Sequence, residues 1–384
     1  MELSFGPNHY VPVLRWKPAE VEALSRLRET TWDHITPLLE LCPPMLLPKN
    51  ETKRKKSFPK KVEDVLSSRL EELSLAVRGN PLFIDLVHLP ESLVCSDGEH
   101  IWDAITKKGT ALGMKVIPVT GFYNKGEGNQ AKISEVIRSF GNGVGIRLFR
   151  EDLEKQSHLA AIPTLLKMLK VNIGEVDLLI DLQLVGDDSP SFNSIIKTIP
   201  QANDWRTVTF IAGSFPIDLT RLKANDTHIL PRKELRNWQN GINQLTGFGK
   251  NRMPSFGDYT TQHAVYKEPV EHPHVSASIR YATPEEWIIF RGEWIGKKNG
   301  TGCAQYPAEA QLLMERTEYS GEDFSFGDRF IAEKARNGSG HPGNSHQWRT
   351  ACINHHMTIT AKTIQPEPRA TEETAITVSV PSQA

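Results

Sequence analysis

Charged, hydroxyl and amide side chains follow several short apolar segments of this chain. Carboxylates and cations that meet at one place shift one another's pKa values, as acid–base catalysis and anion binding require. We therefore expect a catalytic site made of Lys17, Glu40, Asp85, Asp181, Asp258 and Tyr259. The residues expected to bind a ligand are Arg15, His88, Arg147, Gln183, Ser214, Arg280, Arg349, Asn354 and His355. The alternative is that some of these charges pair as buried salt bridges and do no chemistry.

Two kinds of ligand suit these side chains. Glu40, Asp85 and Asp181 offer the oxygen ligands that magnesium or manganese prefers, but no metal-specific spacing accompanies them, so no metal site is predicted. Arg15 and Arg147 suit a phosphate or carboxylate through paired hydrogen bonds, and Lys17 suits such an anion as a point charge. A phosphorylated or other anionic small molecule is therefore a candidate ligand, and the sequence indicates no particular cofactor.

No familiar motif identifies the reaction. The pattern GxxxxGK[ST] is absent, and the glycine-rich residues 141–145 precede an expected strand where a dinucleotide-binding loop would follow one, so they are interpreted as a turn. GxSxG is also missing, which leaves Ser214 as a loop serine that binds a ligand rather than a nucleophile. His341, His346, His355 and His356 fit no zinc motif. The adjacent pair would point about 100° apart on a helix, and we expect it to be solvent-exposed or near a helix end.

Eight short apolar segments separated by helix-like sequence must position these residues. They are residues 10–16, 35–41, 82–89, 115–120, 144–149, 176–185, 207–213, and either 254–260 or 276–281. Parallel strands need long crossover connections, and near-continuous apolar runs fit strands that are covered on both faces. The pattern predicts an α/β fold, a (β/α)₈ barrel of the TIM type that is irregular at its eighth strand. In such barrels the reacting groups lie at the carboxyl ends of the strands.

The chain is longer than a bare barrel needs. We expect the barrel over residues 9–291, with a basic insertion at 43–61, a helical C-terminal extension packed on it over 292–362, and a disordered tail over 363–384. The basic insertion contains one aromatic residue, Phe58, so stacking on nucleic-acid bases is poorly supported and a solvated loop is favoured.

Composition narrows the class of protein further. The 384 residues include 45 basic and 46 acidic ones, so the net charge of −1 creates no overall field that would attract nucleic acid or a membrane surface. The four cysteines lack CxxC spacing and are expected to be free thiols. No apolar run approaches the roughly 18 residues of a membrane span, and the start of the chain does not resemble a signal peptide. We expect a soluble cytoplasmic protein.

Several short motifs occur in a characteristic order along the chain. They are Val-Leu-Arg-Trp-Lys at 13–17, Ile-Thr-Pro-Leu-Leu-Glu at 35–40, Phe-Gly-Asp-Tyr at 256–259, Ser-Ile-Arg-Tyr at 278–281, Trp-Arg at 348–349 and Asn-His-His at 354–356. This series resembles the beta protein family of phages, prophages and bacterial mobile loci. Members are found beside host-killing or phage-exclusion genes, and the founding member resembles an antitoxin. The resemblance implies no reaction and no role for any particular residue.

Two hypotheses about function remain open. In the first, the protein acts in a phage-defence or immunity locus, like an antitoxin, by binding a protein partner encoded by a neighbouring gene. In the second, it is a barrel enzyme, a metal-dependent or acid–base hydrolase or lyase, that acts on a phosphorylated or nucleotide-like ligand. The two are compatible, because a partner could cover the mouth of the barrel.

Overall fold

The computed structural model describes residues 5–43, 61–91, 93–124, 127–247, 253–267, 275–336 and 340–366. The basic insertion, apart from its first and last residues, and the tail beyond residue 366 lie outside the described residues, so the expectations for both stay predictions.

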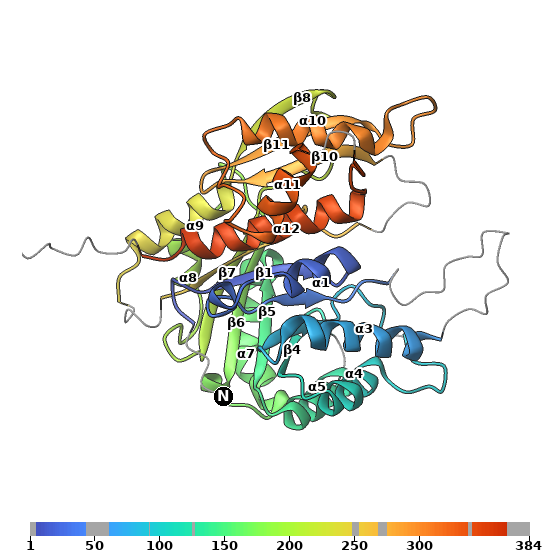
Figure 1. Ribbon diagram of the computed structural model, residues 1–384. Coiled ribbons are helices and arrows are strands. Elements are labelled where there is room, and N and C mark those ends of the chain that lie inside the picture. Colours follow the sequence, from blue (N-terminus) through green and yellow to red (C-terminus); the bar gives the residue numbers. More distant parts are fainter. Residues whose placement is uncertain are drawn as a thin grey trace, which may run out of the picture.

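Eight parallel strands close into a barrel, which confirms the predicted (β/α)₈ fold (Figure 1). The strands in order around the barrel are β1 (Tyr10–Arg15), β2 (Leu38–Glu40), β3 (Leu82–Asp85), β4 (Val116–Thr120), β5 (Val144–Phe149), β6 (Val176–Leu184), β7 (Thr207–Gly213) and β9 (Ser255–Asp258). Strand β9 pairs with both β7 and β1, so the first of the two alternatives for the eighth strand is the one that closes the ring.

The strands alternate between an inner and an outer face. Val11, Val13, Leu38 and Phe83 belong to the cluster that fills the barrel, whereas Leu14 belongs to the cluster under the surrounding helices. Residues two apart on a strand share a face. On β1, β2 and β3 the inner face therefore continues to the polar residue that ends the strand.

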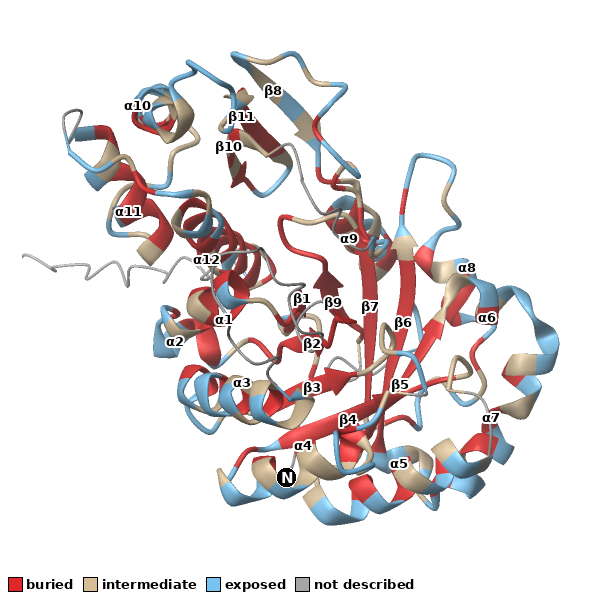
Figure 2. Cartoon of the chain, turned by 90° about the vertical axis from the view of Figure 1, so that its right-hand side faces the viewer, coloured by how far each residue is buried: buried red, intermediate tan, exposed pale blue. Residues whose placement is uncertain are grey.

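The helices surround the barrel with their exposed faces outward (Figure 2). They are α1 (Pro18–Ser25), α2 (Glu29–Trp32), α3 (Val62–Val77), α4 (Ile101–Ala111), α5 (Glu127–Phe140), α6 (Arg150–Glu154), α7 (Gln156–Leu169), α8 (Phe192–Ile196) and α9 (Lys233–Gln244). Short 3₁₀ helices cover Ile173–Glu175 and Gly302–Gln305.

Residues 141–143 connect α5 to β5 as the expected turn. Gly141 and Gly143 have φ angles of 68° and 81°, in the left-handed region that glycine adopts without strain. A Cβ atom on Gly143 would lie 2.4 Å from Nη1 of Arg206, so close packing also requires glycine there.

A second, antiparallel sheet is built from two insertions in the barrel. It has the order β10 (Ser276–Ala282), β11 (Glu286–Trp294) and β8 (Asp226–Pro231). Strand β8 lies in the connection between β7 and α9, whereas β10, β11, α10 (Tyr306–Met314) and α11 (Phe326–Arg336) lie between β9 and α12 (Ser345–Thr363). Both insertions therefore extend from the carboxyl ends of the last two barrel strands. The sequence pattern did not predict β8, because its polar residues interrupt the alternation of apolar and polar side chains that indicates a strand.

Helix α12 belongs to the barrel and to the second sheet at once. Figure 1 shows it between the barrel below and α11 with the second sheet above. Ile353 and Met357 join the barrel's hydrophobic cluster, while Trp348 and Cys352 join the cluster under the second sheet. The expected boundary at residue 291 is therefore corrected: it falls inside β11, because the extra sheet is inserted before the helix that completes the barrel.

No helix in the described ranges is long and apolar enough to cross a membrane.

Candidate functional site

The guanidinium of Arg147 lies at the centre of a cluster of acidic side chains at the carboxyl ends of the barrel strands. Its Nη2 atom donates to Glu40 Oε1 at 2.8 Å and to Asp181 Oδ2 at 2.6 Å, and Nη1 donates to Asp85 Oδ2 at 2.8 Å. The hydroxyl of Tyr259 accepts a hydrogen bond from Arg147 at 3.0 Å and donates to Asp181 at 2.5 Å. We call these five residues the Arg147 cluster. Five separate strand ends meet in it, as the sequence analysis expected.

Strand register explains why these residues meet. Arg15 is paired with Glu40 across β1 and β2, and Glu40 is paired with Asp85 across β2 and β3, so the strand ends lie at one level. All three side chains continue the inward face of their strands, because they follow buried inner residues by two positions.

The charges of the cluster act on one another without water between them. The side chains of Arg147, Glu40, Asp85 and Asp181 are at most 2 % exposed. Burial alone would raise the pKa of Glu40, but Arg147, His88 and Arg15 outweigh it and lower that pKa to about 2. For Asp85, burial prevails over the attraction of Arg147 and raises the pKa. The cluster thus holds more carboxylates than Arg147 alone neutralises.

Further contacts hold the carboxylates in place. The hydroxyl of Tyr123 and the backbone N–H of Val87 both donate to Asp85 Oδ1, each at 2.9 Å. The backbone N–H of Gln183 donates to Asp181 Oδ1 at 2.7 Å from an irregular part of β6, where Gln183 adopts a φ of 55°. The expected ligand residue Gln183 therefore contributes its backbone to the site.

The loop after β9 covers this cluster. Arg15 donates to the carbonyl oxygens of His263 and Ala264 at 2.7 and 3.1 Å. Tyr266 stacks on His88, with ring centroids 4.4 Å apart, and His88 Nε2 lies 3.0 Å from Glu40 Oε2. The carboxylates are therefore both paired and shielded, which is the salt-bridge alternative of the sequence analysis. A divalent cation at Glu40, Asp85 and Asp181 would have to displace the guanidinium.

Asp258 does not join the cluster, which corrects its expected place beside Tyr259. Adjacent strand residues point to opposite faces, so Asp258 points outward. It accepts hydrogen bonds from Tyr10 at 2.5 Å and from Arg232 at 3.1 Å, and it lies 2.8 Å from His356 Nε2. Burial would raise the pKa of Asp258, but His356 and Arg232 lower it to about 2.

The expectation of an exposed or helix-terminal histidine pair is wrong. His355 and His356 are fully buried within α12, because that helix is packed on both sides. His355 Nδ1 lies 2.8 Å from Asp328 Oδ2, and Nε2 lies 2.8 Å from the carbonyl oxygen of Ala282. Both partners are acceptors, and Asp328 also accepts a hydrogen bond from Tyr281. His355 therefore connects α12 to α11 and to the end of β10.

Two other expected ligand residues make structural contacts. Asn354 accepts from the backbone N–H of Gly327 and donates to the carbonyl oxygen of Ala23, both at 3.1 Å, and so ties α12 to α11 and α1. Ser214 donates to the carboxylate of Glu234 and connects the end of β7 to α9. Neither side chain contacts the Arg147 cluster.

Three expected site residues lie at a different place, beside the mouth of the barrel. Arg280 and Arg349 line a cleft of about 470 Å³ between the loops after β7 and β9, the second sheet and α12. Lys17 follows the carboxyl end of β1 and is half-buried, and Arg349 is one of the charges that affect its pKa. Burial lowers the pKa of Lys17, although Glu20 acts in the opposite direction.

We call the cleft of about 470 Å³ the cationic cleft. The residues that line it include Asp218, Arg280, Arg291, Trp294, Tyr306 and Arg349. Asp218 is the one carboxylate among its lining residues, and its Oδ1 atom accepts hydrogen bonds from Thr220. Burial and the neighbouring Arg349 lower the pKa of Arg280 to about 10. Within the described residues, neither Arg280 nor Arg349 forms an ion pair. The cleft therefore carries excess positive charge.

A smaller cleft of about 190 Å³ adjoins the cationic cleft. It is lined by Arg15, Gln262, His263, Lys267 and Arg280, together with Ile217 and Asp218. Arg280, Ile217 and Asp218 line both spaces, so the two adjoin at these residues.

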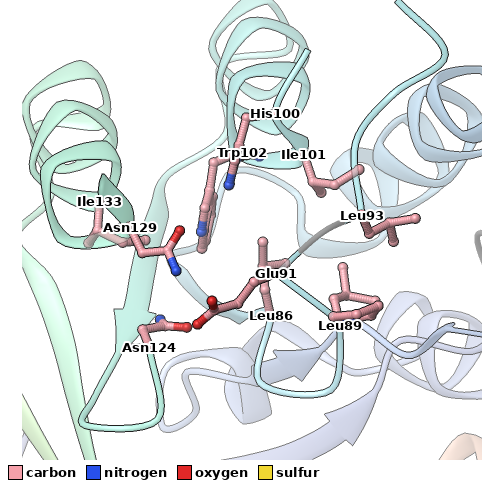
Figure 3. Close-up of a pocket in the computed structure, with 11 residues that line it drawn as sticks. Leu86, Leu89, Glu91, Leu93, His100, Ile101, Trp102, Asn124, Asn129 and Ile133 are labelled. Carbon is pink, nitrogen blue, oxygen red and sulfur yellow. Dashed lines mark hydrogen bonds between the residues drawn. The ribbon is translucent and has the colours of Figure 1, made fainter. Parts of the chain in front are cut away.

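A third cavity lies among the loops after β3 and β4 and the helices α4 and α5 (Figure 3). Figure 3 shows the polar ends of Glu91, Asn124 and Asn129 close together, opposite Trp102. Its volume is about 40 Å³, which is too small for a nucleotide, and no residue of the Arg147 cluster lines it.

Sequence analysis missed several residues that organise these places. Arg232 is fully buried and bonds Asp258, Glu234 and the carbonyl oxygen of Thr283. Tyr123 and Asp328 were missed as well. Tyr123 follows β4 by three residues, so the rule that strand ends carry the site could have indicated it. No comparable signal marks Arg232 or Asp328.

Comparison with known proteins gives a family and two distant structural likenesses. The family model described as Beta protein matches residues 10–362, which confirms the resemblance drawn from the motifs. The chain is similar to the YdjI aldolase from Escherichia coli K12, with a TM-score of 0.37 and 7% identity over 93% of this chain and 90% of that one. It is also similar to a GH113 beta-1,4-mannanase, with a TM-score of 0.35 and 11% identity over 69% of this chain and 91% of that one. A search of curated proteins finds no match. The two structural likenesses are too distant to support a function.

We predict that Arg147→Met destabilises the protein by about 3–5 kcal/mol, because it leaves buried carboxylates without their cation. Arg147→Lys should cost less, since it keeps the charge and loses only part of the hydrogen bonding. Urea denaturation of both variants measures the difference. Arg138→Met, at an exposed position of α5, is the matched control and should lie within about 0.5 kcal/mol of the wild type. A change below 1 kcal/mol in Arg147→Met would contradict a structural role for the cluster.

A second prediction concerns the stability of the protein at acidic pH. The pKa of Glu40 is about 2 in the folded protein against an ordinary value of 4.5, so its stabilising contribution is complete above about pH 5 and is lost as the pH falls from about 4.5 towards 2. The difference in unfolding free energy between wild type and Glu40→Gln should therefore shrink by about 3 kcal/mol across that window. Urea denaturation at several pH values measures it. Glu151→Gln, at a side chain 85% exposed, is the control. A difference that stays constant between pH 6 and pH 3 would show that Glu40 is not stabilised as an anion.

Proposed function

We propose that this chain, which belongs to the Beta protein family, binds a phosphorylated or nucleotide-like anion in the cationic cleft. One observation carries the proposal: Arg280 and Arg349 line the same recessed space and, within the described residues, form no ion pair. Burial lowers the pKa of Arg280 most, and repulsion by the positive charge of Arg349 lowers it further. A bound anion would remove that repulsion.

The place and size of the cleft support a ligand of this class. Its walls come from the loops after β7 and β9, the last two strands of the barrel. In TIM barrels the loops after the last two strands frequently bind phosphate. A guanidinium matches phosphate through two parallel hydrogen bonds, and about 470 Å³ lies within the range of small-molecule sites.

The proposal is for binding rather than turnover. A hydrolase or lyase needs an acid, a base or a metal within reach of its substrate. The carboxylates of the Arg147 cluster are bound to the guanidinium and almost completely buried, and none lines the cationic cleft. The enzyme hypothesis therefore needs a conformational change that uncovers the cluster, whereas binding needs only the geometry present.

We expect the purified protein to bind ATP or GTP in isothermal titration calorimetry at low ionic strength, and more weakly as salt is added. Arg349→Gln, at an exposed position of α12, and Arg280→Gln should each weaken binding about tenfold, the loss of one charge-assisted contact of about 1.4 kcal/mol. Arg69→Gln, on the outer helix α3, removes the same charge elsewhere and should leave the affinity unchanged. Absence of binding at millimolar nucleotide, or equal effects of Arg349→Gln and Arg69→Gln, would overturn the proposal.

We propose a protein partner as the second candidate, supported by apolar side chains around the same clefts. Ile217, Val265 and Trp294 line the two clefts and are 47%, 40% and 41% exposed. A protein segment with both acidic and apolar side chains would match this surface. The phage-exclusion setting implied by the family supports a partner encoded by a neighbouring gene.

Co-purification with the neighbouring gene product tests this second candidate. A stable complex is expected at micromolar concentration, and the double variant Ile217→Ser/Trp294→Ser should weaken it. The variant Leu75→Ser, at a side chain 80% exposed on α3, removes an apolar group away from the clefts and should retain the complex. No complex with the wild type, or the same complex with the double variant, would rule out this surface as the binding site.

A further inference from the structure

We propose that the ligand of this protein carries two phosphate groups, held on opposite sides of Arg280. This inference rests on the proposed function and adds to it the chemical class of the ligand. The cationic cleft would bind one phosphate and the body of the molecule, and the smaller cleft would bind the other phosphate.

Arg280 is the connecting residue because it lines both spaces. Its Nη1 atom donates to the carbonyl oxygen of Thr261 at 2.7 Å, and its guanidinium lies over the ring of Phe215 at 5.0 Å. These contacts orient the side chain and leave its charge unneutralised. An anion on either side would therefore meet a guanidinium that is already positioned, so little side-chain entropy is lost on binding.

Each side of Arg280 has cations of its own. Arg349 and Arg291 line the cationic cleft, whereas Arg15 and Lys267 line the smaller one. The lining of both spaces contains a single carboxylate, Asp218, whose exposed side chain accepts hydrogen bonds from Thr220. One phosphate would neutralise the cations on one side only.

Hydrogen-bond donors also remain unused on both sides. The Nε atoms of Arg15 and Arg291 are buried and have no hydrogen-bond partner within the described residues. Arg15 is only 8% exposed, and its Nε atom lies 3.8 Å from Glu40 Oε2, an ion-pair distance but too long for a hydrogen bond. A buried donor without a partner costs free energy, so the described residues do not fully satisfy these two guanidinium groups.

The two clefts differ in size, which fits a ligand whose larger part lies in the cationic cleft and whose second phosphate lies in the smaller one. About 190 Å³ accommodates a phosphate and little more, whereas about 470 Å³ accommodates a sugar or nucleoside as well. Tyr306 and Trp294 line the larger space and offer aromatic surface to that part of the molecule. The chemistry shared by the candidates is two phosphates on one small organic scaffold, either a nucleoside bisphosphate or a sugar bisphosphate.

Calorimetry with matched pairs of compounds tests the inference. Adenosine 3′,5′-bisphosphate is compared with adenosine 5′-monophosphate, and fructose 1,6-bisphosphate with fructose 6-phosphate, so that the two scaffolds are distinguished. At least one bisphosphate should bind about thirtyfold more tightly than its monophosphate, because the second phosphate gains contacts in the smaller cleft.

Variants on the two sides of Arg280 locate the two phosphates. Lys267→Ala, at an exposed side chain of the smaller cleft, should weaken the bisphosphate about fivefold and leave the monophosphate unchanged. Arg349→Gln should weaken both compounds. Arg69→Gln is again the control.

The possible failures are distinguishable. If neither phosphate compound nor nucleotide binds, the proposed function itself is wrong. A different result overturns only the two-phosphate inference. In that case a monophosphate binds and Arg349→Gln weakens its binding, but the bisphosphate binds no more tightly and Lys267→Ala changes neither affinity. The proposal that the cationic cleft binds an anion would then be retained.

Discussion

The buried guanidinium of Arg147 is the interaction on which the mouth of this barrel depends. It is shared by carboxylates from three other strands and by the hydroxyl of Tyr259 after a fourth. Removing several like charges from water is costly unless a cation with several donors lies among them. The planar fork of arginine offers five donors in fixed directions, whereas a lysine ammonium offers three that rotate together. The cluster therefore fixes the relative positions of the strand ends.

The Arg147 cluster occupies the centre of the barrel mouth, and the cationic cleft lies to one side of it. The insertions after β7 and β9 form a second sheet, and the cationic cleft runs between that sheet, α12 and the loops beside the mouth. Arg15 belongs to both places, since it is paired with Glu40 and also lines the smaller cleft. The smaller cleft and the barrel mouth are thus physically adjacent.

Helix α12 holds the two parts together through buried polar contacts. His356 reaches Asp258 at the end of the last barrel strand, and the adjacent His355 reaches Asp328 of the inserted helix α11. Neighbouring helix positions point about 100° apart. Two consecutive histidines can therefore contact two different packing partners, and here each histidine contacts a carboxylate.

The sequence by itself determined the barrel, because alternating apolar residues and long crossovers allow few other arrangements, and it determined that Arg15, Glu40, Asp85, Arg147 and Asp181 lie at one end. Strand alternation alone could also have separated Asp258 from Tyr259. Only the tertiary structure decided which charges are neutralised. Arg147 is surrounded by carboxylates, whereas Arg280 forms no ion pair within the described residues, although both arginines lie on strands. That difference depends on distances between side chains from separate insertions, which no local pattern encodes.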